Sequence, residues 1–265
     1  MKKIFLNLRE QIKFKLFRPI LLKIGSLMGK YSTVGDHPIF DNQQFKWTEL
    51  LENNWLEIRK ELENILAYHK MLPNLQDIQQ EQKVLNQDNN WKTFFLFGFG
   101  VKATLNCQSC PVTTSLLEQI PGMKTAFFSV LSPHKHIPAH KGIFKGIIRS
   151  HLGLIIPGRS GDCLMRIEKE YIYWQEGKAV VFDDTFDHEV WNNTSETRVV
   201  LLIDVIRPFK SPLTFINNTI IKLIGNSSYV KEAMRNHKKW ETGFYSGTGT
   251  NFQAPKPDAN QLQTR

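Results

Sequence analysis

The hydrophobic positions of this chain follow two different periods. In residues 47–66 the large apolar residues recur every three or four positions, which predicts an amphipathic helix with one buried face. From residue 91 to residue 209 the pattern changes to short runs rich in Val, Ile and Phe, separated by turn-forming pairs such as Pro157-Gly158. This second pattern predicts a succession of short strands, and residues 213–236 return to a helical spacing.

These patterns divide the chain into five segments. We expect a basic amphipathic segment over 1–30, a helical part over 31–90 that packs on the strands, a β-domain over 91–210, a C-terminal helical segment over 211–240 and a flexible tail over 241–265. The 265 residues, 41% of them hydrophobic, are enough to form a full core in one domain.

The positive charge is concentrated near the N-terminus. Residues 1–30 contain eight Lys or Arg and one Glu, and so hold most of the formal net charge of +9. Between these cations, Phe5, Leu8, Ile12 and Leu16 recur at helical spacing, a pattern typical of helices that lie on an anionic membrane surface. A helix packed on the β-domain with its basic face in solvent explains the same pattern equally well.

Other features of the sequence bear on location. No apolar run approaches the length of a membrane span, and no signal peptide is recognisable. Three cysteines without a disulfide pattern favour a reducing compartment. We expect a cytoplasmic protein with no transmembrane span and no nucleic-acid partner. Peripheral contact between residues 1–30 and the inner face of an anionic membrane remains an open alternative.

Histidines alternate with the predicted strands and suggest a metal site. His140 follows Pro138 at the edge of one predicted strand, and His188 lies beside another, so each imidazole could be presented by a different strand. Neutral imidazole binds iron, zinc and copper, and a redox-active iron needs few protein ligands because cosubstrate and oxygen occupy the remaining positions. We therefore predict a metal held by His140 and His188.

Arginines near these histidines suggest an anion site. Arg149 and His151 are two positions apart, so on a strand they face the same side, and Arg198 precedes the apolar run VVLLIDV. A buried guanidinium binds a carboxylate through two parallel hydrogen bonds, as a dicarboxylate such as 2-oxoglutarate would require. The alternative is that the arginines form structural ion pairs with nearby aspartates, namely Asp183, Asp184 or Asp204.

The whole ordered set of motifs resembles the aspartyl/asparaginyl β-hydroxylase family, which includes bacterial lipid A hydroxylases. The matching segments span roughly residues 37–210 and include FSVLSPHKHIPAHKG, RSHLGLIIP, WQEGKAVVFDDTFDHEVWN and RVVLLIDVIRP. The resemblance implies a mainly β fold, a double-stranded β-helix (jelly roll, cupin-like) with flanking N- and C-terminal helices. It also implies an enzyme, a dioxygenase that uses Fe(II), 2-oxoglutarate and O2 to hydroxylate its substrate.

The resemblance also assigns roles to single residues. Carried over by position, the family's two iron ligands, which form its catalytic centre, fall on His140 and His188. The residues that match the family's 2-oxoglutarate contacts are Ser129, Arg149, His151 and Arg198.

Gly142 stands where most enzymes of the wider superfamily supply a carboxylate ligand. Animal aspartyl hydroxylases are similar to this chain in having glycine there, whereas bacterial lipid A hydroxylases tend to keep an acid. Gly142 therefore favours the β-carbon of Asp or Asn residues in a peptide or protein as the site of hydroxylation. Hydroxylation of a lipid acyl chain at the membrane surface is the alternative, and a non-catalytic cupin-like binding module is a minor one.

Several other residues have simpler interpretations. His136 is a weaker metal candidate than His140, and Cys107-x-x-Cys110 lacks the second pair that a zinc site would need. The remaining candidates are expected to support the site: the aspartates anchor the turn before the second histidine, and the tryptophans form core or pocket wall. These residues are Asp183, Asp184, Trp174 and Trp191.

Overall fold

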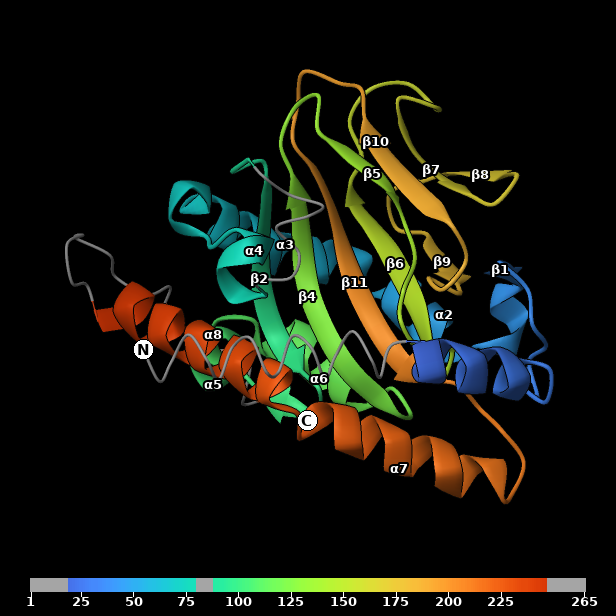
Figure 1. Ribbon diagram of the computed structural model, residues 1–265. Coiled ribbons are helices and arrows are strands. Elements are labelled where there is room, and N and C mark those ends of the chain that lie inside the picture. Colours follow the sequence, from blue (N-terminus) through green and yellow to red (C-terminus); the bar gives the residue numbers. More distant parts are fainter. Residues whose placement is uncertain (1–18, 80–87, 247–265) are drawn as a thin grey trace.

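Two antiparallel β-sheets lie face to face in the computed structural model, which describes residues 19–79 and 88–246 (Figure 1). The larger sheet contains β1 (Ile39–Phe40), β2 (Trp91–Gly98), β3 (Val101–Lys102), β4 (Met123–Leu131), β6 (Ile147–Ile155), β9 (Ala179–Phe182) and β11 (Arg198–Ile206), in the order β1-β9-β6-β11-β4-β2-β3. The smaller sheet contains β5 (His136–His140), β7 (Cys163–Ile167), β8 (Glu170–Tyr173) and β10 (His188–Asn192), in the order β5-β10-β7-β8. The predicted jelly-roll, cupin-like fold is confirmed.

The central strands are apolar along their whole length because both faces of the larger sheet are covered. Phe127 and Leu202 point between the two sheets and belong to one buried cluster. Their chain neighbours, Phe128 and Leu201, point the other way and belong to a second cluster under the helices. This alternation of side chains is the period of two that a strand imposes.

Helices cover the outer face of the larger sheet. They include α2 (Trp47–Asn53), α3 (Trp55–Leu66), α5 (Thr104–Ser109), α6 (Pro111–Glu118) and α8 (Ser228–Ser246). The expected apolar face of residues 47–66 is confirmed, since its residues Leu51, Ile58, Leu62 and Ile65 have no exposed surface. The prediction of one continuous helix is wrong, because the chain breaks at Asn54, whose side-chain amide donates to the Leu50 carbonyl at 2.8 Å.

Two predicted segments differ from the structure at their ends. β1 lies within the helical part predicted for 31–90 and pairs with β9, so that part also contributes to the sheet. The prediction of a flexible tail is wrong for its first six residues, 241–246, because α8 continues to Ser246. Glu241 accepts hydrogen bonds from the backbone N–H groups of Leu105 and Asn106 at 3.0 Å, which ties this turn of α8 to α5.

The rest of the predicted tail, residues 247–265, lies outside the described residues. So do residues 1–18, with the predicted amphipathic positions Phe5, Leu8, Ile12 and Leu16. Residues 19–29 are helical, and they pack Leu21 against Phe144 and Ile221 at the end of the sheet where α7 (Leu213–Gly225) lies. None of the helices in the described part of the chain is long and apolar enough to cross a membrane.

Candidate active site

The two candidate iron ligands face each other across two paired strands. His140 is the last residue of β5, His188 is the first residue of β10, and they are directly opposite in the antiparallel register. Their ring centroids are 4.0 Å apart. Each Nδ1 lies 2.9 Å from the backbone carbonyl oxygen two residues earlier, at Pro138 and Phe186 respectively. When each Nδ1–H donates to its carbonyl, each Nε2 keeps a free lone pair, as a metal ligand requires.

Burial keeps both imidazoles neutral. It lowers the pKa of His140 to about 4, with a further contribution from the neighbouring His188, and it lowers the pKa of His188 to about 4. Neutral imidazole is the form that binds a metal. Among the described residues, no third His, Cys, Asp or Glu joins this pair in a group that could hold a metal ion.

Gly142, two residues after His140, has no room for a side chain because Asp184 occupies the space next to it. A Cβ atom built on Gly142 would lie 2.3 Å from Asp184 Oδ1, far inside van der Waals contact. The backbone N–H of Gly142 also donates to the Asp184 carbonyl at 2.7 Å. A side chain at this position therefore requires Asp184 to move, so local packing accounts for the glycine.

Arg198, His151 and Trp174 form a second cluster, which we call the unpaired cluster. The Arg198 guanidinium carbon lies 3.8 Å from the centroid of the Trp174 ring, and the His151 ring centroid lies 5.7 Å from that of Trp174. Nε and Nη2 of Arg198, both ring nitrogens of His151 and Nε1 of Trp174 are buried and have no hydrogen-bond partner among the described residues. Polar groups this well buried normally have partners, so the cluster fits a ligand that accepts hydrogen bonds.

The charge of the unpaired cluster specifies the ligand further. Burial lowers the pKa of Arg198 to about 9, and burial together with the nearby Arg198 charge lowers the pKa of His151 well below its usual value. Arg198 therefore still carries a positive charge at neutral pH, without a counter-ion from the described chain. Because an uncompensated buried charge costs several kcal/mol, the cluster fits an anion, and a planar guanidinium is well matched to a carboxylate.

The other two predicted cosubstrate residues already have protein partners. The Ser129 hydroxyl accepts a hydrogen bond from Trp91 Nε1 at 3.1 Å. Arg149 donates to both carboxylate oxygens of Asp204, at 2.8 and 3.0 Å, and its Nη1 lies 3.0 Å from Asp184 Oδ2. Arg149 thus forms the structural ion pairs that the sequence left open as an alternative, whereas Arg198 does not.

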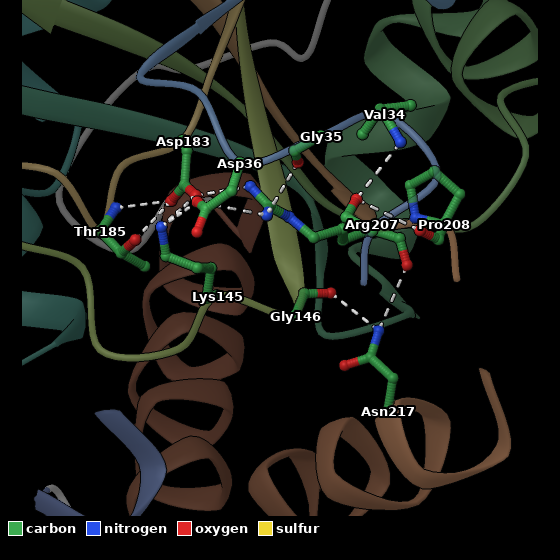
Figure 2. Close-up of polar contacts among 11 residues, drawn as sticks. Val34, Gly35, Asp36, Lys145, Gly146, Asp183, Thr185, Arg207, Pro208 and Asn217 are labelled. Carbon is green, nitrogen blue, oxygen red and sulfur yellow. Dashed lines mark hydrogen bonds and ion pairs between the residues drawn. The ribbon is translucent and has the colours of Figure 1, made fainter. Parts of the chain in front are cut away.

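The turn before His188 is held by buried ion pairs (Figure 2). Asp183 accepts hydrogen bonds from the backbone N–H of Thr185 at 2.9 Å and from its hydroxyl at 2.6 Å, and it pairs with Arg207 and with Lys145. Lys145 also pairs with Asp36. The expectation that Asp183 anchors this turn is confirmed, and Lys145 connects the turn to the loop that follows His140.

The remaining candidates lie away from these clusters or take simpler roles. His136 stacks on Trp191, with ring centroids 5.2 Å apart, and its Nε2 lies 2.7 Å from Glu189 Oε1. Cys107 and Cys110 are buried free thiols whose pKa values are raised by burial. Sequence reasoning gave Trp174 only a place in the core or pocket wall, because its position over Arg198 depends on how β-strands far apart in sequence come together.

Comparison with known protein families shows to which family the chain belongs. The model of the aspartyl/asparaginyl β-hydroxylase family matches residues 52–208, more than half of the chain. The chain belongs to this family. The resemblance drawn from the motifs is confirmed, and the chain is an enzyme of the hydroxylase type.

Relatives within the family act on different substrates. An ornithine lipid ester-linked acyl 2-hydroxylase from Rhizobium tropici is 42% identical over 249 residues, which cover 94% of this chain and 89% of that protein. Human aspartyl/asparaginyl β-hydroxylase is 33% identical over 209 residues, which cover 72% of this chain and 27% of that protein. Among solved structures, the cupin domain of Schizosaccharomyces pombe Cnp3 aligns with 49% of this chain and 69% of that chain, with a TM-score of 0.32 and 12% identity. The higher identity and coverage favour the lipid alternative over the peptide interpretation that Gly142 suggested.

Proposed function

We propose that the protein is an Fe(II)- and 2-oxoglutarate-dependent hydroxylase that acts on the acyl chain of a lipid. The observation that carries the proposed chemistry is the fully buried guanidinium of Arg198, whose Nε and Nη2 have no partner among the described residues, in the same β-sandwich as two neutral, facing imidazoles. The first would supply a site for a carboxylate, and the second would supply two ligands for a metal.

His140 and His188 would hold the iron. Neither Nε2 has a hydrogen-bond partner within residues 19–79 and 88–246, and both rings are oriented by backbone carbonyls. When bound there, iron would supply, with 2-oxoglutarate and O2, the hydroxylation of an unactivated C–H bond coupled to oxidative decarboxylation of the cosubstrate to succinate and CO2. The ion pairs of Asp183 hold the turn that carries His188, so they limit movement of this ligand.

The unpaired cluster would bind the cosubstrate. Arg198 offers unpaired N–H groups to one carboxylate, and that carboxylate would compensate its buried charge. His151 and the indole N–H of Trp174 offer further polar atoms beside it. Ser129 accepts from Trp91, so its own hydroxyl proton is free to be donated. Arg149 would act mainly by positioning Asp184, because two carboxylates already neutralise its charge.

The lipid substrate is proposed from the relationship to the Rhizobium tropici enzyme, which covers 94% of this chain. Because that enzyme is an ornithine lipid ester-linked acyl 2-hydroxylase, the first test looks for hydroxylation at C2 of an ester-linked acyl chain of ornithine lipid. The second candidate is the β-carbon of Asp or Asn residues in a peptide. It is supported by the 33% identity with the human enzyme.

The test compares both substrate classes in one assay. Purified protein receives Fe(II), 2-oxoglutarate and O2 together with ornithine lipid, with a diacyl phospholipid or with an Asp-containing peptide. We expect succinate to form with the lipid substrate. Mass spectrometry should show one added oxygen at C2 of the fatty acids released from the lipid, and no added oxygen on the peptide. His140→Ala serves as the control without a metal site. Hydroxylated peptide with unchanged lipid would replace the lipid proposal, and absence of succinate in every arm would refute the cosubstrate.

A further inference from the structure

A cleft outside the candidate active site lies between α7, α8 and one end of the larger sheet. Its volume is about 760 Å³. Four cationic side chains line it, and no Asp or Glu does; the cations are Lys124, Lys222, Lys231 and Arg235. None of the four forms an ion pair with another residue in the described part of the chain. The cleft therefore presents positive charge that the described residues leave uncompensated.

The same cleft has an apolar side. Ile221 and Val230, which are 6% and 2% exposed, form part of its lining together with Phe99 and Met234. A lining that combines cations with aliphatic and aromatic side chains is suited to an amphiphile with an anionic head. A small hydrophilic anion would gain nothing from the apolar part.

An exposed apolar stripe adjoins this cleft. On α7, Phe215 is 76% exposed, Ile216 is 41% exposed and Leu223 is 65% exposed. Phe215 and Leu223 are eight positions apart, a spacing that keeps both within one face of the helix, while Ile221 faces the protein. Lys222 lines the cleft and directly precedes Leu223. Of the four cations, Lys222 therefore shares α7 with the apolar stripe, and the other three reach the cleft from β4 and α8.

The helix formed by residues 19–29 adds to this surface. Its Leu21 packs in the same buried cluster as Ile221, and Figure 1 shows it beside α7 at the same end of the molecule. On its outer side Ile20 is 51% exposed and Leu27 is 57% exposed, and Lys23 is exposed near them. Two adjacent helices therefore expose large apolar side chains and cations together.

We propose that this face, the α7 surface, docks on a bilayer that contains anionic phospholipid. Headgroup phosphates would occupy the cationic cleft, and Phe215, Leu223 and Leu27 would enter the boundary between headgroups and acyl chains. This mixture of cations and exposed apolar residues is what peripheral membrane helices use. A purely polar anionic partner such as nucleic acid would leave the exposed apolar stripe in water.

The α7 surface is connected to the candidate active site through one loop. Phe144, four residues after His140, packs in the same cluster as Leu21 and Ile221. Docking would therefore bring the end of β5 that carries His140 close to the bilayer. The proposal itself does not depend on the proposed hydroxylase activity, because the binding surface shares no residue with the metal or cosubstrate clusters.

The test is sedimentation of the full-length protein with vesicles, without iron or 2-oxoglutarate. One set of vesicles contains phosphatidylcholine alone, and the other is an equal mixture of phosphatidylcholine and phosphatidylglycerol. We expect binding to the mixed vesicles that weakens as salt rises. Lys222→Glu/Arg235→Glu and Phe215→Ser/Leu223→Ser should each reduce partitioning at least about tenfold. Point variants are used because removal of residues 1–30 would take the buried Leu21 and Met28 out of the fold.

A matched control lies on the hairpin between β7 and β8. Lys169→Glu/Tyr171→Ser changes an exposed cation and an aromatic residue that is 52% exposed, away from α7, and should leave binding unchanged. Equal effects of the control and the α7 variants, or equal binding to neutral vesicles, would overturn the proposal. If Phe215→Ser/Leu223→Ser lowers the melting temperature but leaves vesicle binding unchanged, the stripe packs against another part of the chain, and the proposal is wrong. Binding to duplex DNA instead of vesicles would also overturn it.

Discussion

Two arginines of this protein are buried to the same degree and have opposite surroundings. Arg198 and Arg207 are each 1% exposed. Arg207 pairs with Asp183, and Asp36 lies 3.9 Å from its Nη1, whereas Arg198 packs against Trp174 and has unpaired nitrogens. A buried guanidinium needs a counter-charge. The described chain supplies this counter-charge to Arg207, which serves the fold. It supplies none to Arg198, which fits a ligand from outside.

The largest expected effect tests the structural side of this comparison. Arg207→Met leaves the carboxylate of Asp183, which has no exposed surface, with Lys145 at 3.3 Å as its remaining close cation. We expect the free energy of unfolding to fall by about 3–5 kcal/mol, as for other broken buried pairs, measured by urea denaturation. Arg207→Met/Asp183→Leu removes both charges and should recover part of the loss. A stability equal to that of the parent would show that the Arg207 pair does not hold the fold.

The second effect tests the binding side. Arg198→Met should weaken the use of 2-oxoglutarate by about 2–5 kcal/mol, or roughly 30-fold to several thousand-fold, because a desolvated carboxylate loses its charged partner. The measurement is the dependence of succinate formation on 2-oxoglutarate, with iron affinity measured separately. Without cosubstrate, this variant should be no less stable than the parent, since it loses an uncompensated charge. Equal losses of iron and cosubstrate affinity would make Arg198 a structural residue like Arg207.

The third effect extends the comparison to buried histidines. The pKa values of His188 at the active site and His237 on α8 are both lowered to about 4 by burial, from the usual 6.5. Below pH 6.5 the unfolded chain binds protons that the native protein does not, so stability should fall between about pH 6.5 and 4. Each histidine contributes up to about 3 kcal/mol of this loss. His237→Gln should reduce the acid sensitivity of the melting temperature and keep iron affinity, whereas His188→Gln should reduce both.

The smallest expected effect concerns Gly142, two residues after His140. Gly142→Asp should lower turnover, because its Cβ would lie 2.3 Å from Asp184 Oδ1, and overpacking of this kind costs about 1–3 kcal/mol. Gly142→Asp/Asp184→Gly removes the clash and should restore part of the turnover, measured as succinate formed per protein. A large gain in activity from Gly142→Asp alone would mean that the two-histidine assignment is wrong.

The sequence by itself determined the strand pattern, the helix period and the placement of histidines on strands. These are local properties, because the side chains of a strand alternate and those of a helix recur every three to four residues. His140 and His188 follow from such patterns together with the family motifs. The alternation of Phe127 and Phe128 between two cores also follows, once both faces of the sheet are covered.

Only the tertiary structure decided what each charged group contacts. Arg149 and Arg198 carry the same prediction from the sequence, but the register of β6 against β11 places Asp204 opposite Arg149, 55 residues away in the chain. No carboxylate of the described chain lies in the corresponding place for Arg198. The tertiary structure also decided that Asp184 lies beside Gly142 and that cationic side chains meet between α7 and α8. Periodicity is written into neighbouring residues, whereas the partner of a buried charge depends on strand register and helix packing across the whole fold.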